Sequence, residues 1–288
     1  AHMVNSNVSL RPAVLNDQGR IANLIYFESH VHRHLDWRSP LDWLGANEYW
    51  VLEQGNQLVA VLACPSDPPG IAWIRLFAHA RSISAEQAWD ALWPVAYELA
   101  YRRGQQLLAA INLQQWFGAL LSKSGFKLEQ QIVVLEHHQA ANFVADRNLS
   151  FPIRPMTQDD LPAVAELDAA AFKPLWQNSQ TSLQMAFAQA GLATVIEDQG
   201  RLVAYQISTV SPFGMHLARL AVAPECQGKG FGLALGQDLL HYAGRNVPGR
   251  VTVNTQSDNI SSLSLYRKMG FLLTGEQYPV YVFSGQQP

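Results

Sequence analysis

The feature of this sequence that most limits its possible folds is a weak internal repeat. The tripeptide Leu10-Arg11-Pro12 has a counterpart in Ile153-Arg154-Pro155, 143 positions later. A second phrase, Leu120–Phe126, resembles Leu265–Phe271 with an offset of 145 positions. At 288 residues the chain is also longer than one compact core usually is. Two landmarks with nearly equal offsets therefore predict that one fold occurs twice in the chain.

The two halves show the same order of predicted elements, in which strands alternate with helices. In the first half, the helices, hairpin and strands are expected at 18–30, 49–62, 71–77, 85–103, 107–111 and 131–136. Their counterparts in the second half are expected at 158–172, 193–207, 216–222, 232–244, 250–254 and 278–283. Apolar runs that flank a short glycine-containing turn mark the two hairpins. The sequence therefore predicts a mixed α/β (α+β) fold in two tandem domains, 4–139 and 151–288, joined by a polar linker at 140–150.

Composition narrows the class of protein. A net charge of −3 argues against a nucleic-acid binder that works through a basic surface. No apolar run approaches the roughly 18 residues of a membrane span, and Ala1-His2-Met3 resembles a cloning remnant with no signal peptide behind it. Cys64 and Cys226 lie in different halves and favour a reducing compartment. We expect a cytoplasmic protein without nucleic-acid or membrane partners, and a monomer or weak dimer, because tandem domains can bury the surface that a dimer would.

The sharpest chemical signal is a glycine-rich loop between an apolar strand and a helix. The strand ends at Pro224 and is followed by Gly228, Gly230 and Gly232, with Lys229 between the first two glycines. Glycines allow a tight backbone turn, so the N–H groups of the loop and of the first helical turn point at one spot that suits a diphosphate. The loop lacks both the Gly-x-Gly-x-x-Gly fingerprint and the Ser or Thr of a Walker loop.

A second signal lies downstream in Val251–Phe271. A strand ends near Asn254, and a helix starts with Asp258 or Asn259 as its N-cap. Asn259, Ser262 and Tyr266 then share one helical face. Taken alone, Tyr266 is typical of a packed core tyrosine.

Together, Val-x-Pro-x-x-Gln-Gly-x-Gly-x-Gly and Asn-x-x-Ser-x-x-Leu-Tyr-x-x-x-Gly-Phe closely resemble the motifs of the GNAT family of acyl-CoA-dependent N-acyltransferases. The resemblance covers about residues 150–283. It implies acetyl-CoA as the acyl donor, CoA as the product, and direct attack by a neutral primary amine without a covalent enzyme intermediate. The acceptor amine, on a small molecule or a peptide, is not identified by the sequence.

The resemblance also assigns roles to residues. The backbone of Leu220 and Val222 would run beside the pantetheine arm and stabilise the thioester oxyanion. The loop amides would hold the pyrophosphate, and Tyr266 would protonate the leaving thiolate. The full set expected to contact the cofactor is Leu220, Ala221, Val222, Gln227, Gly228, Lys229, Gly230, Phe231, Gly232, Asn254, Asn259, Ser262 and Tyr266.

The usual carboxylate base of the family is missing. Many members carry a glutamate on the strand before the glycine loop, where this chain has Ala218 and Arg219; others carry one at the position of Asn254. His216, with a reference pKa of about 6.5, is the nearest titratable candidate for a catalytic base. A packed strand histidine, a water chain or an already deprotonated amine are the alternatives.

In proteins of this family the stretch Lys173–Ser179 would overhang the acceptor site. Trp176 is then expected to line that site, together with Tyr205 and Ser208 from the neighbouring strand. A hydrophobic anchor for the stretch is the alternative role of Trp176.

The first half resembles the same fold with the chemistry removed. Its Phe77–Ala85 segment has no glycine, and Gln114 and Leu121 stand at the asparagine and tyrosine positions. Seven of the eight tryptophans also lie here, namely residues 37, 43, 50, 73, 89, 93 and 116. We expect large side chains to fill the vacated cofactor cleft, and the half to shape the acceptor pocket or to mimic the second subunit of a dimer.

The sequence offers alternatives for a histidine cluster and for the function. His30, His32 and His34 suggest a metal site, but without a nearby cysteine or carboxylate pattern a polar helix end is favoured and no metal is predicted. The function is either N-acetyl transfer by the second domain or, because the carboxylate base is missing, non-catalytic binding and sensing of acyl-CoA.

Overall fold

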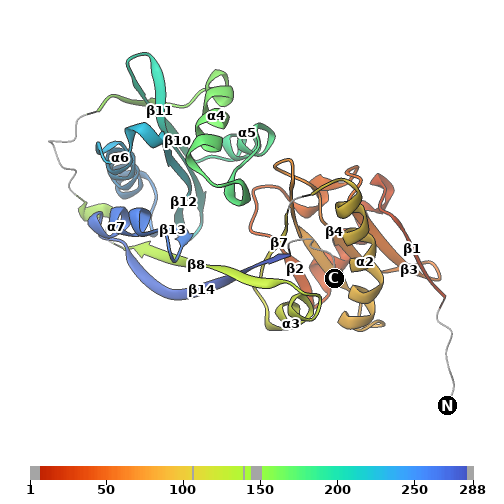
Figure 1. Ribbon diagram of the computed structural model, residues 1–288. Coiled ribbons are helices and arrows are strands. Elements are labelled where there is room, and N and C mark those ends of the chain that lie inside the picture. The colour runs from red at the N-terminus through yellow and green to blue at the C-terminus, as the bar shows by residue number, and fades with distance from the viewer. Residues whose placement is uncertain (1–6, 106, 139, 144–150, 284–288) are drawn as a thin grey trace. The chain divides into compact units, whose positions relative to one another are not determined.

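The computed structural model describes residues 7–105, 107–138, 140–143 and 151–283 (Figure 1). The chain divides into two compact units, of which unit 1 contains Ala1–Glu129 and Pro279–Pro288 and unit 2 contains Gln130–Tyr278. Among the described helices, none is both long and apolar enough to cross a membrane.

This division differs from the predicted boundaries because the two closing strands are exchanged. The predicted closing strand of the first half belongs to β8 (Lys127–His137), which pairs with β13 (Arg250–Gln256) of unit 2. That of the second half is the end of β14 (Leu272–Phe283), which pairs with β7 (Leu107–Ile111) of unit 1. The predicted linker at 140–150 begins as a short 3-10 helix, η3 (Ala140–Asn142), and its residues 144–150 lie outside the described part of the chain.

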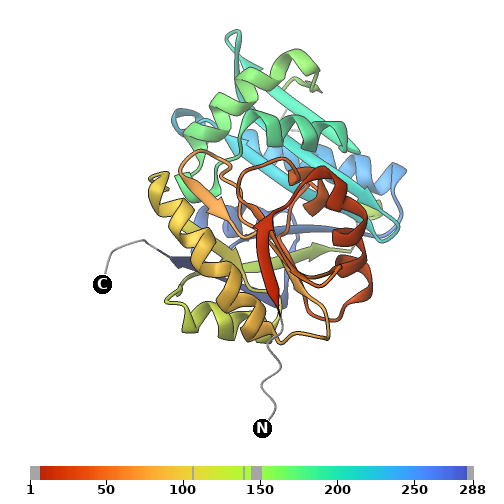
Figure 2. The ribbon, with the colours of Figure 1, turned by 90° about the vertical axis from the view of Figure 1, so that its right-hand side faces the viewer.

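Unit 1 is a sheet with helices on both faces. Its elements before β7 are β1 (Val8–Pro12), η1 (Leu15–Asp17), α1 (Gln18–Phe27), β2 (Val31–Arg33), η2 (Pro40–Trp43), β3 (Tyr49–Gln54), β4 (Gln57–Ala63), β5 (Ile71–Trp73), β6 (Leu76–His79) and α2 (Ala85–Arg102), and α3 (Gln115–Lys123) follows β7. The antiparallel strands have the order β1-β3-β4-β6-β2, and β5 pairs in parallel with β7. Alternate residues of β4 pack against α1 and α2, which therefore cover opposite faces of the sheet (Figure 2).

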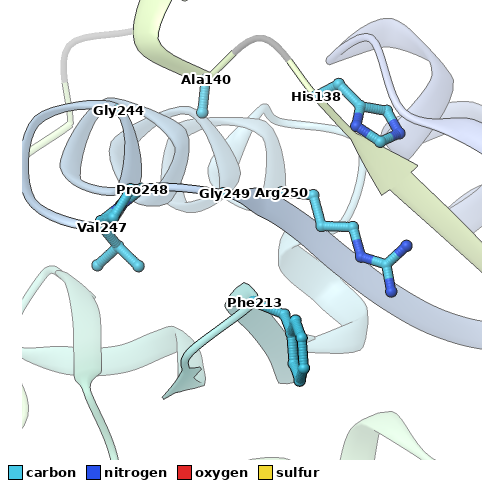
Figure 3. A pocket seen from close by; sticks show the side chains of 8 residues that line it. All are labelled: His138, Ala140, Phe213, Gly244, Val247, Pro248, Gly249 and Arg250. Carbon is cyan, nitrogen blue, oxygen red and sulfur yellow. The ribbon is translucent and has the colours of Figure 1, made fainter.

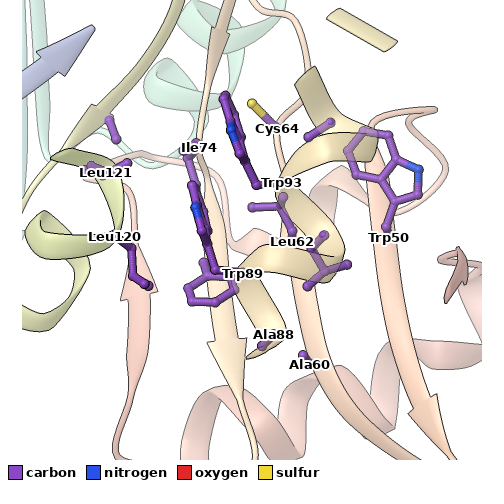
Figure 4. Packing of buried hydrophobic residues seen from close by; sticks show 14 of the residues in the cluster. Trp50, Ala60, Leu62, Cys64, Ile74, Ala88, Trp89, Trp93, Leu120 and Leu121 are labelled. Atoms are coloured by element: carbon purple, nitrogen blue, oxygen red, sulfur yellow. The ribbon is translucent and has the colours of Figure 1, made fainter. Parts of the chain in front are cut away.

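Aromatic side chains fill the face of unit 1 beneath α2 and α3 (Figure 4). Trp89 and Trp93 stack with ring centroids 5.4 Å apart. Phe77 of β6 lies 5.2 Å from Trp89 and 6.1 Å from Phe117 of α3, again between centroids. The space between β6, α2 and α3 in unit 1 is thus occupied by rings.

Unit 2 repeats this plan with a longer sheet. Its further elements are β9 (Ile153–Pro155), η4 (Gln158–Asp160), α4 (Leu161–Ala171), η5 (Pro174–Trp176), α5 (Gln180–Ala188), β10 (Leu192–Asp198), β11 (Arg201–Ser211), β12 (Gly214–Val222), η6 (Pro224–Cys226), α6 (Phe231–Asn246) and α7 (Ile260–Lys268). The strand order is β14-β8-β13-β12-β11-β10-β9, in which β12 and β13 run parallel. Helices α6 and α7 pack on the face that carries Leu217 and Val253, and α4 lies on the opposite face.

The Arg-Pro repeat corresponds to the same ion pair in both units. Arg11 binds Asp17 through two hydrogen bonds of 2.7 Å, and Arg154 binds Asp160 through two of 2.8 Å. In each unit the carboxylate also accepts from a backbone N–H at the start of the first helical segment. The hydrogen bonds from Arg154 lower the pKa of Asp160 to about 2. The repeated tripeptide therefore fixes the first strand to the first helix.

The histidines at 30, 32 and 34 do not form the polar helix end that the sequence favoured. Helix α1 stops at Phe27, and His32 lies in β2, where it is 1% exposed and stacks on Phe117 with centroids 4.0 Å apart. Its Nε2 lies 3.1 Å from the carbonyl oxygen of Ile74. Within the described ranges, no three potential metal-ligand side chains gather.

Burial of His32 predicts acid sensitivity of unit 1. Burial lowers the pKa of His32 to about 4, while an unfolded histidine titrates near about 6.5. The unfolded state therefore binds the extra proton between these values, and unit 1 should lose about 3 kcal/mol of stability as the pH falls from about 6.5 to about 4.

Tryptophan fluorescence during urea unfolding measures this loss, because seven of the eight tryptophans belong to unit 1. His32→Gln should flatten the pH dependence, although His34, whose pKa burial also lowers, retains part of it. An unchanged slope in His32→Gln would contradict the assignment to His32.

Candidate active site

Strands β12 and β13 part toward their carboxyl ends. Their parallel pairing runs from Gly214 opposite Arg250 to Leu217 opposite Val253. Beyond this point β12 continues along β11, and β13 continues along β8 to Gln256. We call the region between Ala218–Val222 and Asn254–Gln256 the strand split. Within the described residues, the facing backbone edges of the strand split have no strand partner, so they are able to bind an extended ligand.

A β-bulge at Ala218 begins the strand split. The partners of Leu217 and Arg219 on β11 are the adjacent residues Ser208 and Ile207, so Ala218 is left without a partner. The extra residue shifts the alternation of side chains. As a result, Leu217 and Leu220 both pack toward α6, while Arg219 points to the face that carries α4.

The glycine loop follows β12 and ends in an uncapped helix. Gly228 and Gly230 have φ values of +79° and +92°, a left-handed conformation that favours glycine. Gly230 is the N-cap of α6 and supplies no side-chain hydrogen bond to the first turn. The N–H groups at the start of α6 are therefore available to an anion, and the helix dipole favours negative charge there.

Close packing brings this helix start against β12 and α7. A Cβ atom on Gly232 would lie 3.3 Å from Leu265 and 3.5 Å from Val222. The start of α2 in unit 1 is different, because Ser84 and Gln87 cap each other's backbone N–H groups at 3.1 Å. Of the two equivalent helices, only α6 starts with glycine rather than with a capping side chain.

The second motif lies on α7 and on the end of β13. Asn259 is the N-cap, since its Oδ1 accepts from the backbone N–H of Ser262 at 3.1 Å. Tyr266 is 5% exposed and packs on Phe271 with centroids 5.8 Å apart. Burial raises the pKa of Tyr266, and the positive charge of Arg219 opposes this shift. Asn254 is exposed on β13 just beyond its pairing with β12.

His216 lies on the paired part of β12, before the bulge. Its Nδ1 is 2.8 Å from the hydroxyl oxygen of Thr252 on β13. Burial lowers the pKa of His216, so the ring is neutral at neutral pH. A neutral imidazole is able to accept a proton, but its role as a base stays a prediction.

An Asp-Arg-Tyr cluster, formed by Asp168, Arg219 and Tyr205, lies beneath the 172–179 loop. Asp168 is fully buried on α4 and binds Arg219 through bonds of 2.8 Å to Nε and 3.0 Å to Nη2. The hydroxyl of Tyr205 donates to the same carboxylate at 2.6 Å. Although burial opposes the charge of Arg219, the carboxylate keeps its pKa raised. Burial and the adjacent carboxylate raise the pKa of Tyr205 well above that of a free phenol.

The three residues expected at the acceptor side have protein partners. Trp176 donates from Nε1 to Gln130 at 2.8 Å, and its carbonyl oxygen accepts from Arg219. Tyr205 and Ser208 are fully buried, and the hydroxyl of Ser208 donates to Gln206 at 2.6 Å. Their contact with an acceptor stays a prediction.

Sequence reasoning missed Asp168 and the role of Arg219. A signal for Asp168 was present, because Leu161, Val164 and Asp168 recur at the spacing of one buried helix face. A charged residue on such a face needs a buried partner. Arg219 carried no comparable signal, since only the fold brings it to Asp168.

A separate pocket of unit 2 contains none of these residues (Figure 3). It has a volume of about 530 Å³ and is lined by His138, Ala140, Phe213, Gly244, Val247, Pro248, Gly249 and Arg250. Gly214 and Arg250 pair at the opposite end of β12 and β13 from the strand split. His138 and Arg250 both contact the carboxylate of Glu136, so the guanidinium group of Arg250 at this pocket already has an acidic partner.

The sequence of unit 2 is similar to those of known proteins. Residues 161–271 match the model of the acetyltransferase (GNAT) family. An uncharacterized N-acetyltransferase of Methanocaldococcus jannaschii is 31% identical over 125 residues, which are 41% of this chain and 76% of that protein. The N-alpha-acetyltransferase RimI of Mycobacterium tuberculosis is 29% identical over 139 residues, which are 46% of this chain and 85% of that protein.

The whole chain also matches solved structures. A tandem GNAT protein from the clavulanic acid biosynthesis pathway superposes with a TM-score of 0.68 and 16% identity, covering 98% of this chain and 100% of that one. At this identity the match establishes the fold, which is that of two GNAT domains. The relative in Methanocaldococcus and the match to the family model establish the family as well as the fold: the chain belongs to the acetyltransferase (GNAT) family.

Proposed function

We propose that unit 2 transfers the acetyl group of acetyl-CoA to a primary amine by direct attack, and that unit 1 is not catalytic. The observation that carries this proposal is the uncapped, glycine-rich start of α6 at the open end of β12. This helix start is able to bind an anion, and within the described residues the adjacent end of β12 has no partner on its β13 side. Tyr266 lies on α7, which packs against the same helix start.

Acetyl-CoA supplies a thioester, whose acetyl carbonyl is attacked by an amine. The N–H groups of Gly228–Gly232 and the side chain of Gln227 would bind its pyrophosphate, and Lys229 would add charge attraction. The edge of β12 at Leu220–Val222 would bind the pantetheine arm, with Asn259 and Asn254 on the opposite side. A backbone N–H of this edge would stabilise the oxyanion, and Tyr266 would donate its proton to the departing thiolate.

The proposal extends to the base, the class of acceptor and the assembly. His216 is neutral and remains the candidate base, with a water chain or a free amine as alternatives. The acceptor is a small-molecule or peptide amine rather than a nucleic acid. A monomer or weak dimer stays the prediction for the assembly. Because one relative is named an N-alpha-acetyltransferase, a peptide with a free amino terminus is one acceptor to test.

Unit 1 is proposed to bind no acetyl-CoA. Its helix α2 starts with a reciprocal cap, and rings occupy the space beside β6. The equivalents of the glycine loop and of Tyr266 are Phe77–Ala85 and Leu121, which offer neither convergent amides nor a phenol.

Calorimetric titration of the full chain with acetyl-CoA tests the proposal. We expect one site per chain, followed by CoA release when a primary amine is added from a panel of a polyamine, an amino sugar and an alanine-terminated peptide. Two sites would contradict the reading of unit 1. Binding without release on any amine would favour an acyl-CoA sensor, and no binding would contradict both functions.

A further inference from the structure

The 172–179 loop is bonded to β12 at the strand split and to residues beside the end of β13. On the β12 side, Arg219 donates from Nη2 to the carbonyl oxygen of Trp176 at 2.5 Å. On the β13 side, the indole N–H of Trp176 donates to Gln130 at 2.8 Å, and Gln130 donates to Asp258 at 3.4 Å. Asp258 follows β13 and directly precedes the N-cap of α7. Trp176 therefore connects Arg219 of β12 with Gln130 of β8 and, through Gln130, with the segment that follows β13.

Arg219 is held too firmly to act as a mobile surface charge. Its side chain is 12% exposed, and its guanidinium carbon lies 3.5 Å from the ring centroid of Phe172, at the start of the same loop. Asp168 fixes the guanidinium by two bonds and also accepts from the backbone N–H of Asn178 at 2.8 Å, at the other end of the loop. The planar guanidinium group of arginine directs several N–H donors in fixed directions, which the ammonium group of a lysine does not reproduce.

The surroundings of Arg219 connect the 172–179 loop to the reacting groups. Arg219 directly follows the bulge residue Ala218, so it sits where β12 turns away from β13. Its charge also acts on Tyr266 across the strand split. Arg219 thus bonds to the loop, belongs to the strand edge, and places a positive charge that affects the pKa of the proposed acid, Tyr266.

We propose that Arg219 is a positioning residue, which holds Trp176 over the strand split through the Asp-Arg-Tyr cluster and thereby sets the fit of the acceptor amine. The inference rests on the proposed acetyltransferase function. It assigns to Arg219 no contact with acetyl-CoA, which the loop at Gly228–Gly232 binds separately. Loss of the Arg219 contacts should therefore weaken acceptor binding and leave acetyl-CoA binding intact.

Arg219→Lys tests this separation, because it keeps the charge beside Asp168 and loses the planar guanidinium group. We expect the KM for the panel amine with the fastest CoA release to rise about 10-fold, since a hydrogen bond from a charged donor is lost. The acetyl-CoA dissociation constant should stay unchanged. Amide hydrogen exchange in peptides covering 173–179 should accelerate about 10-fold, while exchange in 228–236 stays as in the native chain.

Arg154→Lys is the matched control, because Arg154 makes the same two-bond contact with Asp160 in unit 2. It should change neither the amine KM nor the exchange at 173–179. If Arg219→Lys fails to fold, Tyr205→Phe removes one bond to Asp168, keeps the ion pair, and should shift the same measurements in the same direction.

Two results would overturn the inference. One is a native amine KM together with native exchange at 173–179 in the Arg219 variant. The other is a rise in the acetyl-CoA dissociation constant as large as the rise in amine KM, which would place Arg219 in the cofactor site. Failure of the proposed function is distinct, because the native chain would then bind no acetyl-CoA or release no CoA.

Discussion

Replacement of Tyr266 by phenylalanine is expected to lower amine-dependent CoA release by about 10²- to 10⁴-fold, the usual contribution of a positioned general acid. The ring should keep its packing against Phe271, because only the hydroxyl is removed. Acetyl-CoA affinity, measured by calorimetry, should therefore stay within about twofold, as expected when a group acts only in the transition state.

Burial of Tyr266 gives this prediction a pH signature. Because burial raises the pKa of the phenol, Tyr266 stays protonated through the range near about pH 10 where an exposed tyrosine ionises. The rate in the native chain should show no alkaline loss from this group. Tyr242→Phe on α6 is the control and should leave turnover unchanged; an equal loss in both variants would show that repacking, and not the proton, is responsible.

Replacement of Gly228 by glutamate is expected to weaken acetyl-CoA binding by about 100-fold or more. The carboxylate would stand at the proposed pyrophosphate site, and juxtaposed like charges cost several kcal/mol. No atom lies within 4 Å of a Cβ built on Gly228, so the new side chain meets open space rather than a packed core. The loss should appear in calorimetry as a higher dissociation constant. The left-handed φ of +79° at Gly228 strains any other side chain, so the thermal unfolding midpoint should also fall by a few degrees.

Gly200→Glu provides a close control for this variant. Gly200 lies in the turn between β10 and β11 of the same unit, has a φ of +76° against +79° for Gly228, and also has no atom within 4 Å of a built Cβ. The two variants share the backbone strain and the added charge. If both variants bound acetyl-CoA with the same affinity, the result would contradict the proposal that the glycine loop binds acetyl-CoA.

Local patterns predicted most of the fold. The matching Arg-Pro tripeptides indicated the repeat. They match because each arginine makes the same ion pair with an aspartate six residues later, which is a short-range contact. The glycine loop and the N-cap at Asn259 were readable for the same reason, since turn and cap chemistry depends on neighbouring residues. One predicted strand at 71–77 is divided in the structure into β5 and β6, at Ile74 and Arg75.

Features that depend on distant residues were not readable. Both closing strands are apolar, and two copies of one fold offer similar edges to them, so the sequence does not say which copy each strand joins. The ion pair of Asp168 with Arg219 spans 51 positions and forms only when α4 lies on β12. The bond from the hydroxyl of Tyr205 to that buried carboxylate likewise joins residues 37 positions apart, and the expectation that Tyr205 lines the acceptor site stays a prediction.

The exchanged strands have a consequence for the chain as it leaves the ribosome. Residues 1–129 emerge before unit 2, yet β7 pairs with Val280–Phe283, which are synthesised after all of unit 2. The edge of β7 that pairs with β14 thus has no partner strand while unit 2 is synthesised. An exposed strand edge is a site at which incorrect pairing can occur. Unit 2 has all of its strands once residue 278 has emerged. Unit 1 is therefore begun before unit 2 and completed after it.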